Sequence, residues 1–206
     1  LEANTTASNN TAIGLAALKA NTTGQLNTAV GANALDANTT GADNVSIGRS
    51  SLTTNTTGSY NTAVGGSALE VNSTASNNTA VGYSTLKANT TGSQNVAVGY
   101  NALDANTTAS NNTAIGHGVL TSATTATENT AVGRASMTNT TTGGYNVAVG
   151  SGSLYTNVTG ANNVALGRDA LLMSTASNNT AVGKHALTAN TTGTRNTAVG
   201  VDSLDT

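Results

Sequence analysis

The 206-residue sequence contains no Pro, Cys, Trp or Phe, and only 8% of its residues are charged. Without cysteine, the chain can form neither a disulfide nor a thiolate metal site. A globular core of this length normally uses bulky apolar residues, whereas the apolar residues here are mostly Ala and Val. Asn, Thr, Ser and Gly dominate the rest, but disordered chains are usually rich in charge and Pro and lack a strict apolar period. The composition therefore indicates an ordered chain that is not an ordinary globular domain.

Charge of both signs is scarce, and the net charge at pH 7 is −2. So small a charge does not steer a protein to nucleic acid or to a membrane surface, and no run of Lys or Arg could follow a phosphate backbone. We therefore expect no nucleic-acid partner and no direct membrane contact from this segment. The sequence begins with Leu1 and carries no signal peptide. We expect it to be a piece of a longer chain.

One motif recurs along the whole sequence every seventeen residues, except for a single unit that is one residue shorter. It is an Asn followed by Thr or Val, then Ala or Ser, then Val, Ile or Leu, and then Gly. Counting this Asn as position one, the unit continues with Leu at position nine and Asn-Thr-Thr at positions twelve to fourteen. We treat residues 1–206 as a single repeat array whose units start at Asn10, Asn27, Asn44, Asn61, Asn78, Asn95, Asn112, Asn129, Asn146, Asn163, Asn179 and Asn196.

The length of the unit predicts its fold. Such a unit is too short for two helices and a turn, and Asn, Thr, Val and Gly are poor helix formers. The motif predicts a short strand ended by Gly, a second extended piece through position nine, and a turn at Asn-Thr-Thr. Each unit then forms one coil. Parallel stacking of the coils predicts an all-β protein, a parallel β-solenoid or β-roll of about twelve coils.

Stacking would place equivalent side chains above one another in columns. We expect Val, Ile or Leu at position four and Leu (once Met137) at position nine to form two apolar columns, and Asn at position one to form a column of hydrogen-bonded amides. Thr at position fourteen, from Thr6 to Thr192, is expected to bond in a similar way. Position three is Ala in every unit except Ser46. Because so small a side chain lets another backbone approach, we expect this strand to lie at a subunit interface around a threefold axis, in a homotrimer.

The Asn-Thr-Ala-Val-Gly and Asn-Val-Ala-Val-Gly segments resemble the YadA-like head repeat of trimeric autotransporter adhesins. They resemble even more closely the repetitive shaft of bacteriophage tail-fibre proteins. The resemblance covers essentially the whole chain, in twelve in-phase copies. It implies a left-handed, trimeric β-roll in an extracellular place, on a virion tail or a bacterial cell surface. It also implies attachment to a host receptor or glycan through flanking domains. The adhesin heads differ in having a shorter repeat.

No constellation of residues in the sequence points to catalysis. The two histidines, His117 and His185, belong to units four coils apart, which is about 19 Å along the axis and too far to share a metal. Acidic residues fall at the variable positions seven, ten and seventeen, and neither a Ca²⁺-binding repeat nor a phosphate-binding glycine loop occurs. We therefore expect no enzyme activity, no catalytic residues, no metal site and no cofactor.

The variable positions are expected to face solvent. At position six, Tyr83 and Tyr100 belong to adjacent units and are expected to stack, either as a plain ladder or as a platform for a sugar. Position ten alternates in sign through Glu70, Lys87 and Asp104, so stacked neighbours attract each other weakly. The Asn-Thr-Thr segments are N-glycosylation sequons or simply turn residues.

Three functions remain open on the sequence alone. A stiff segment of a surface fibre fits a rod of similar coils best. An ice-binding solenoid would need regular Thr arrays, but the Thr at position two alternates with Val, as at Val45, Val96, Val147 and Val164. A polysaccharide-degrading tail spike would need a groove lined with carboxylates.

Overall fold

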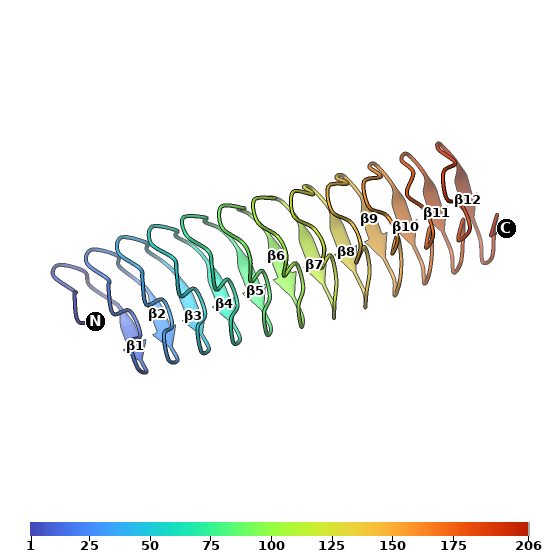
Figure 1. Cartoon of the computed structure of the whole chain (residues 1–206). Coiled ribbons are helices and arrows are strands. Elements are labelled where there is room, and N and C mark those ends of the chain that lie inside the picture. Colours follow the sequence, from blue (N-terminus) through green and yellow to red (C-terminus); the bar gives the residue numbers. More distant parts are fainter. Residues whose placement is uncertain (206) are drawn as a thin grey trace.

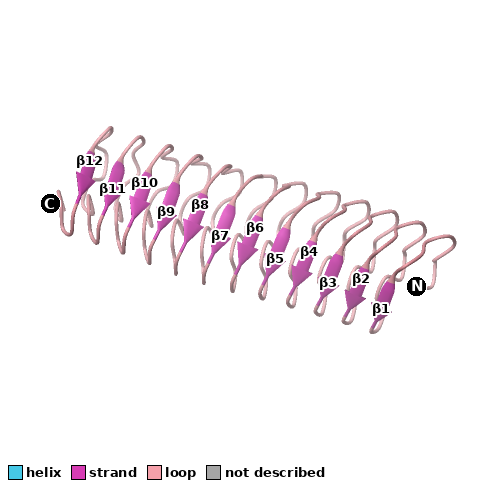
Figure 2. Cartoon of the chain, turned by 180° about the vertical axis from the view of Figure 1, so that it is seen from behind, coloured by secondary structure: helices cyan, strands magenta, loops and turns pink. Residues whose placement is uncertain are grey.

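A computed structural model describes residues 1–205, which form a rod of stacked coils (Figure 1). Each strand is three residues long and starts directly after a repeat Asn. The strands pair in sequence order as one parallel sheet along the rod, which confirms the predicted β-solenoid (Figure 2). No helix in residues 1–205 is long and apolar enough to cross a membrane. The strands are β1 (Thr11–Ile13), β2 (Thr28–Val30), β3 (Val45–Ile47), β4 (Thr62–Val64), β5 (Thr79–Val81), β6 (Val96–Val98), β7 (Thr113–Ile115), β8 (Thr130–Val132), β9 (Val147–Val149), β10 (Val164–Leu166), β11 (Thr180–Val182) and β12 (Thr197–Val199).

The register of the sheet follows the sequence repeat and survives the single shortened unit. Val164 of β10 still pairs with Thr180 of β11, at the same strand position, although one residue is missing between them. The missing residue comes out of the turn, because the N–H of Thr175 bonds the carbonyl of Thr191 as position thirteen does in other coils. Position fourteen is therefore the one lost. A deletion is tolerated there because the turn lies on the surface.

Hydrogen bonds join the coils around the whole perimeter, not only along the strands. The N–H of Leu69, at position nine, donates to the carbonyl of Thr85 in the next coil at 3.0 Å. In the turn, the N–H of Ser73 donates to the carbonyl of Thr90 at 3.1 Å. The polar groups of the turns are thus satisfied by the adjacent coil, so the stack needs only short strands.

The interior contains small side chains, and the β-branched side chains of the strands lie outside. Ala at position three and Leu at position nine are fully buried, as at Ala80 and Leu86, whereas Val81 at position four is only half-buried. The prediction of an internal column at position four is therefore wrong. Position three is small because it faces the narrow interior of its own coil, and not because a second chain approaches it there. The inferred interface at the Ala side of the strand is wrong for the same reason.

Leu at position nine lies in a turn rather than in the second extended piece predicted from the sequence. Leu69 and Leu86 have φ values of 51° and 50°, in the left-handed region. This conformation costs a side chain about 1–2 kcal/mol. Full burial of a Leu side chain contributes about 1.5–3 kcal/mol, so burial offsets the strain. The turn conformation is adopted because it points the Leu inward.

Two columns of buried Asn run inside the rod, where one was predicted. At position one, the Oδ1 of Asn61 accepts from the backbone N–H of Asn78 at 3.1 Å, and its Nδ2 donates to the carbonyl of Ala75 at 2.9 Å. At position twelve, the Nδ2 of Asn72 donates to the same carbonyl at 3.0 Å and to the Oδ1 of Asn55 at 2.9 Å. In each such coil, two Asn side chains thus donate to the same carbonyl and hold the coil closed. The same amides also form hydrogen bonds with the neighbouring coils.

The Thr column that bonds along the rod is at position thirteen, and the prediction for position fourteen is wrong. The hydroxyl of Thr39 donates to the carbonyl of Thr56 in the next coil at 3.0 Å. Thr40, at position fourteen, is exposed. Adjacent residues of this turn point to different sides, so only the first of the tandem Thr can reach the neighbouring coil.

Candidate functional site

The outer side of the sheet is a continuous surface along the whole rod. We call the side chains at positions two and four of β1–β12 the sheet face. In every unit, position two is Thr or Val and position four is Val, Ile or Leu, so no charge interrupts the sheet face. Typical members are substantially exposed, such as Ile115 at 39% and Val149 at 40%. Sheets that face water normally carry polar side chains outward, whereas sixteen of these twenty-four side chains are Val, Ile or Leu and the other eight are Thr.

The size of the sheet face can be estimated from strand geometry. Twelve strands about 4.8 Å apart and three residues wide cover an area of about 55 Å by about 10 Å, or roughly 550 Å². Two thirds of its side chains are apolar, so the apolar part is comparable with the largest apolar patches on monomeric proteins, about 300–600 Å², and such patches commonly mark interaction sites. The sheet face is therefore the first candidate for binding.

The aromatic residues at position six form a stack, as predicted for Tyr83 and Tyr100. Their ring centroids are 5.8 Å apart with planes 14° apart, and Tyr100 stacks in turn on His117 at 5.1 Å and 12°. A Cβ on Gly66, the preceding residue of the column, would contact the Tyr83 ring, so Tyr83 lies against this glycine. Each ring covers part of the next, and Tyr83 and Tyr100 remain about half exposed. Sugar binding by Tyr83 and Tyr100 remains a prediction.

Position ten shows the attraction predicted from its alternating charges. Lys87 Nζ lies 3.7 Å from Glu70 Oε2. In the next coil, burial raises the pKa of Asp104, an effect that backbone hydrogen bonds and the charge of Lys87 oppose. The Oδ1 of Asp104 is buried without a hydrogen-bond partner, as is the Oδ1 of Asn101. Here the buried polar atoms are less well satisfied than in the Asn column at position one.

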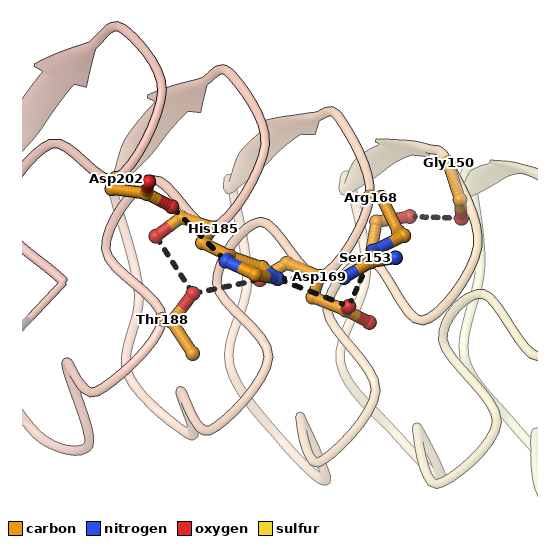
Figure 3. A network of polar contacts seen from close by, with 7 residues as sticks. All are labelled: Gly150, Ser153, Arg168, Asp169, His185, Thr188 and Asp202. Carbon is orange, nitrogen blue, oxygen red and sulfur yellow. Dashed lines mark hydrogen bonds and ion pairs between the residues drawn. The ribbon is translucent and has the colours of Figure 1, made fainter.

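Charged side chains gather at position seven near the end of the described chain (Figure 3). His185 lies between Asp169 and Asp202, with its Nδ1 3.0 Å from Asp202 Oδ1. Arg168 bridges two acceptors, since its Nε is 3.0 Å from Asp169 Oδ2 and its Nη2 is 3.1 Å from His185 Nε2. A carboxylate can only accept, so in the neutral imidazole Nδ1 donates to Asp202 and Nε2 accepts from Arg168.

His185 was considered only together with His117, four coils away, so this cluster was not predicted. Asp169, His185 and Asp202 all stand at position seven of three consecutive units. Their shared position in the repeat was the signal that could have revealed the cluster, because stacking places equivalent side chains next to each other.

A groove of about 470 Å³ lies beside this cluster. Its floor includes Gly152, its two ends carry Arg134 and Asp169, and Tyr155 and Met173 contribute to its wall. It lies at positions six, seven, ten and eleven, beyond the Gly that ends each strand, so it is separate from the sheet face. Regular stacking of the repeat does not predict such a groove. Within residues 1–205, no group of three or more His, Asp or Glu side chains could hold a metal ion.

The buried Asn column also bears on the sequons. Asn38, Asn55 and Asn89 are fully buried, and the Nδ2 of each donates hydrogen bonds. A glycan attached to such a nitrogen would replace these bonds and has no room inside the coil. The geometry favours turn formation as the role of these Asn residues.

Compared with protein-family models, curated proteins and solved structures, the chain matches none of them.

Proposed function

We propose that this chain is a shaft or head segment of a surface fibre, and that three copies pack through their sheet faces. The apolar, uncharged sheet face is the observation that carries the proposal. Its neighbouring coils are about 4.8 Å apart along the entire rod. A second copy of the same rod matches that period at every coil, whereas a globular partner would contact only a few coils.

The area is adequate for a repeated contact of this kind. Each partner in a standard protein interface buries about 800 Å², and the sheet face alone supplies roughly 550 Å². Side chains flanking the sheet face would add to this when two rods meet. The net charge of −2 hardly opposes self-association. Left-handed coils around a threefold axis would agree with the resemblance to adhesin heads and tail-fibre shafts.

The biological role follows from the shape. A rod whose length is set by its number of coils is a spacer that holds a binding tip away from a surface. We propose an extracellular place, on a virion tail or a bacterial surface, with attachment to a receptor or glycan supplied largely by flanking domains. Such a segment needs no enzyme activity of its own.

Light scattering combined with size-exclusion chromatography tests the proposal. We expect a mass three times the chain mass of 20.1 kDa. Replacing Val64 and Val81 with Lys would place two charges in the sheet face, and we expect a monomer. The control replaces Thr74 and Thr91, exposed turn residues in the same coils, with Lys and should leave the mass unchanged. A wild-type monomer at all concentrations would contradict the proposal.

Ice binding is the second candidate, and the same surface favours it. Position two is Thr in eight of the twelve units, and each of these Thr is followed two residues later by Val or Ile on the same side of the sheet. This gives a flat array with a regular spacing of about 4.8 Å along the rod. Thermal hysteresis by the wild-type monomer, lost on the Val64 and Val81 replacements, would favour this function over self-association.

A further inference from the structure

The groove lies where the residues at positions six and seven are small. Coil nine carries Ser151 and Gly152 at these positions, whereas the coils on either side carry Arg134 and the pair Arg168 and Asp169. A Cβ on Gly152 would collide with Asp169 Oδ1, so the carboxylate occupies the space that the glycine leaves. The gap is thus a local departure from the repeat, and it is lined by side chains from three successive coils.

The Asp169 carboxylate is held in a fixed orientation at one end of the groove. Arg168 Nε lies 3.0 Å from Asp169 Oδ2 (Figure 3), whereas Oδ1 is the oxygen next to Gly152. His185 Nε2 also lies 3.5 Å from Asp169 Oδ2. The cation beside Oδ2 offsets the negative charge, and Oδ1 faces the floor of the groove. Oδ1 is therefore a positioned hydrogen-bond acceptor.

Arg134 supplies the opposite chemistry at the other end. It belongs to the coil two steps before Asp169, which places the two residues about 10 Å apart along the rod. Arg134 forms no ion pair with any residue in the described range 1–205. Its guanidinium can therefore hold a planar anion with two parallel hydrogen bonds.

The wall between these ends is aromatic and aliphatic. The Tyr155 side chain is 36% exposed and Met173 is 48% exposed, with Leu172 beside them. Ligand sites combine such a wall with a few oriented polar groups. The C–H face of a sugar ring packs on an aromatic face, and sugar hydroxyls donate to carboxylate oxygens.

We infer that this groove binds a carboxylate-bearing sugar. The sugar carboxylate pairs with Arg134, a ring hydroxyl donates to Asp169 Oδ1, and the C–H face lies against Tyr155. The inference goes beyond the fibre role and depends on the groove alone, because the groove does not include the sheet face. Loss of self-association would leave it intact.

Saturation-transfer NMR and titration of the purified chain test the inference. The probes are N-acetylneuraminic acid and glucuronic acid, with N-acetylglucosamine and glucose as uncharged controls. We expect binding of at least one acidic sugar, at least about tenfold tighter than its uncharged counterpart, because the uncharged sugars cannot form the charge-assisted bonds to Arg134. The acid that binds more tightly tells whether the natural sugar is of the sialic or the uronic type.

The chain offers a matched pair of glycine replacements. Gly152 and Gly118 both stand at position seven with φ values of 68° and 64°, and Asn occupies this position with similar φ at Asn33 and Asn101. Asn is therefore compatible with the backbone at both sites. Gly152→Asn displaces the Asp169 carboxylate and narrows the groove, and should weaken binding at least about tenfold. Gly118→Asn points into open space and should leave binding unchanged.

A second pair of variants isolates the charge. Arg134→Gln should remove the preference for acidic sugars, while Arg49→Gln, at position six of a distant coil, should keep it. Circular dichroism confirms that each variant retains the fold. The inference is overturned if the wild-type chain binds neither acidic sugar, if it binds the uncharged sugars equally well, or if both members of a folded pair behave alike.

Discussion

The two halves of the rod use the same repeat with different regularity. In the first half, the position-twelve column is unbroken, and each amide bonds the next from Asn106 back to Asn21. In the second half, Ala123, Thr140 and Ser174 interrupt the column. The buried Oδ1 atoms of Asn106 and Asn157 consequently have no partner. The position-one column continues through both halves, from Asn10 to Asn196.

This difference shows which column the fold depends on more. A side chain at position twelve bonds a carbonyl of its own coil, as Asn157 Nδ2 does with Gly160 at 2.9 Å, and at most one neighbouring Asn side chain on each side. A side chain at position one also accepts the backbone N–H of the next coil, and that donor would otherwise be buried without a partner. Breaks are therefore tolerated at position twelve and do not occur at position one. The groove also lies in the less regular half, where departures from the repeat make room for specific side chains.

The largest effect is expected from breaking the continuous column, with Asn78→Leu. Leu cannot accept from Asn95, whose N–H and Nδ2 lie 3.0 and 3.2 Å from Asn78 Oδ1, and cannot donate to the carbonyl of Gly92. Leaving these buried groups unpaired should lower the free energy of unfolding by about 3–5 kcal/mol. Urea denaturation measures the change, and a loss below about 1 kcal/mol would refute the role given to this column.

A comparison of Asn72→Ala with Asn157→Ala measures the difference between the halves directly. Asn72 donates to Asn55 and Ala75 and accepts from Asn89, whereas Asn157 makes only the bond to its own coil. We expect losses of about 2–3 kcal/mol for Asn72→Ala and about 1 kcal/mol for Asn157→Ala. Equal losses would mean that the bonds between coils contribute nothing.

Repairing the second half should stabilise it. In Ala123→Asn, the new amide could donate to Asn106 Oδ1 and to the carbonyl of Ala126, as the equivalent Asn do in the regular half. The expected gain is about 1 kcal/mol in unfolding free energy. Ala88→Asn, at the half-buried position eleven, is the control and should have little effect. A destabilised Ala123→Asn would show that the coils there have closed around the smaller side chain.

The smallest effect on stability is expected at Asp104, whose Oδ1 is buried without a hydrogen-bond partner in the regular half. Burial raises the pKa of Asp104 in the folded state, so its ionised form destabilises the fold as the pH rises through that pKa. Asp104→Asn should therefore raise the melting temperature by about 1–2 °C at pH 7, and the gain should vanish near pH 3. Melting curves at both pH values test this, and an equal gain at both would exclude ionisation as the cause.

The sequence predicted the stacking but not the direction of the side chains. The period was enough to predict the solenoid, the strand positions and the Asn column at position one. It could not show that Leu69 and its counterparts take a left-handed turn, because bulky residues rarely do so without the tertiary burial that offsets the strain. Because position nine was assigned to an extended segment, the wrong face of the strand was predicted to point inward. Val81 was therefore placed in the core instead of Ala80. The cluster around His185 follows from the shared position seven and could have been predicted, whereas the groove depends on a single departure from the repeat at Gly152.

A single cysteine in the sheet face tests the proposed association most directly, because the natural chain has none. Val98→Cys places a thiol at position four, and Thr91→Cys places one in the exposed turn outside the sheet face. If copies pack through their sheet faces, mild oxidation should form interchain disulfides rapidly in Val98→Cys and only slowly in Thr91→Cys, as measured on non-reducing gels. Equal rates in the two variants, or a faster reaction in Thr91→Cys, would contradict the proposed arrangement.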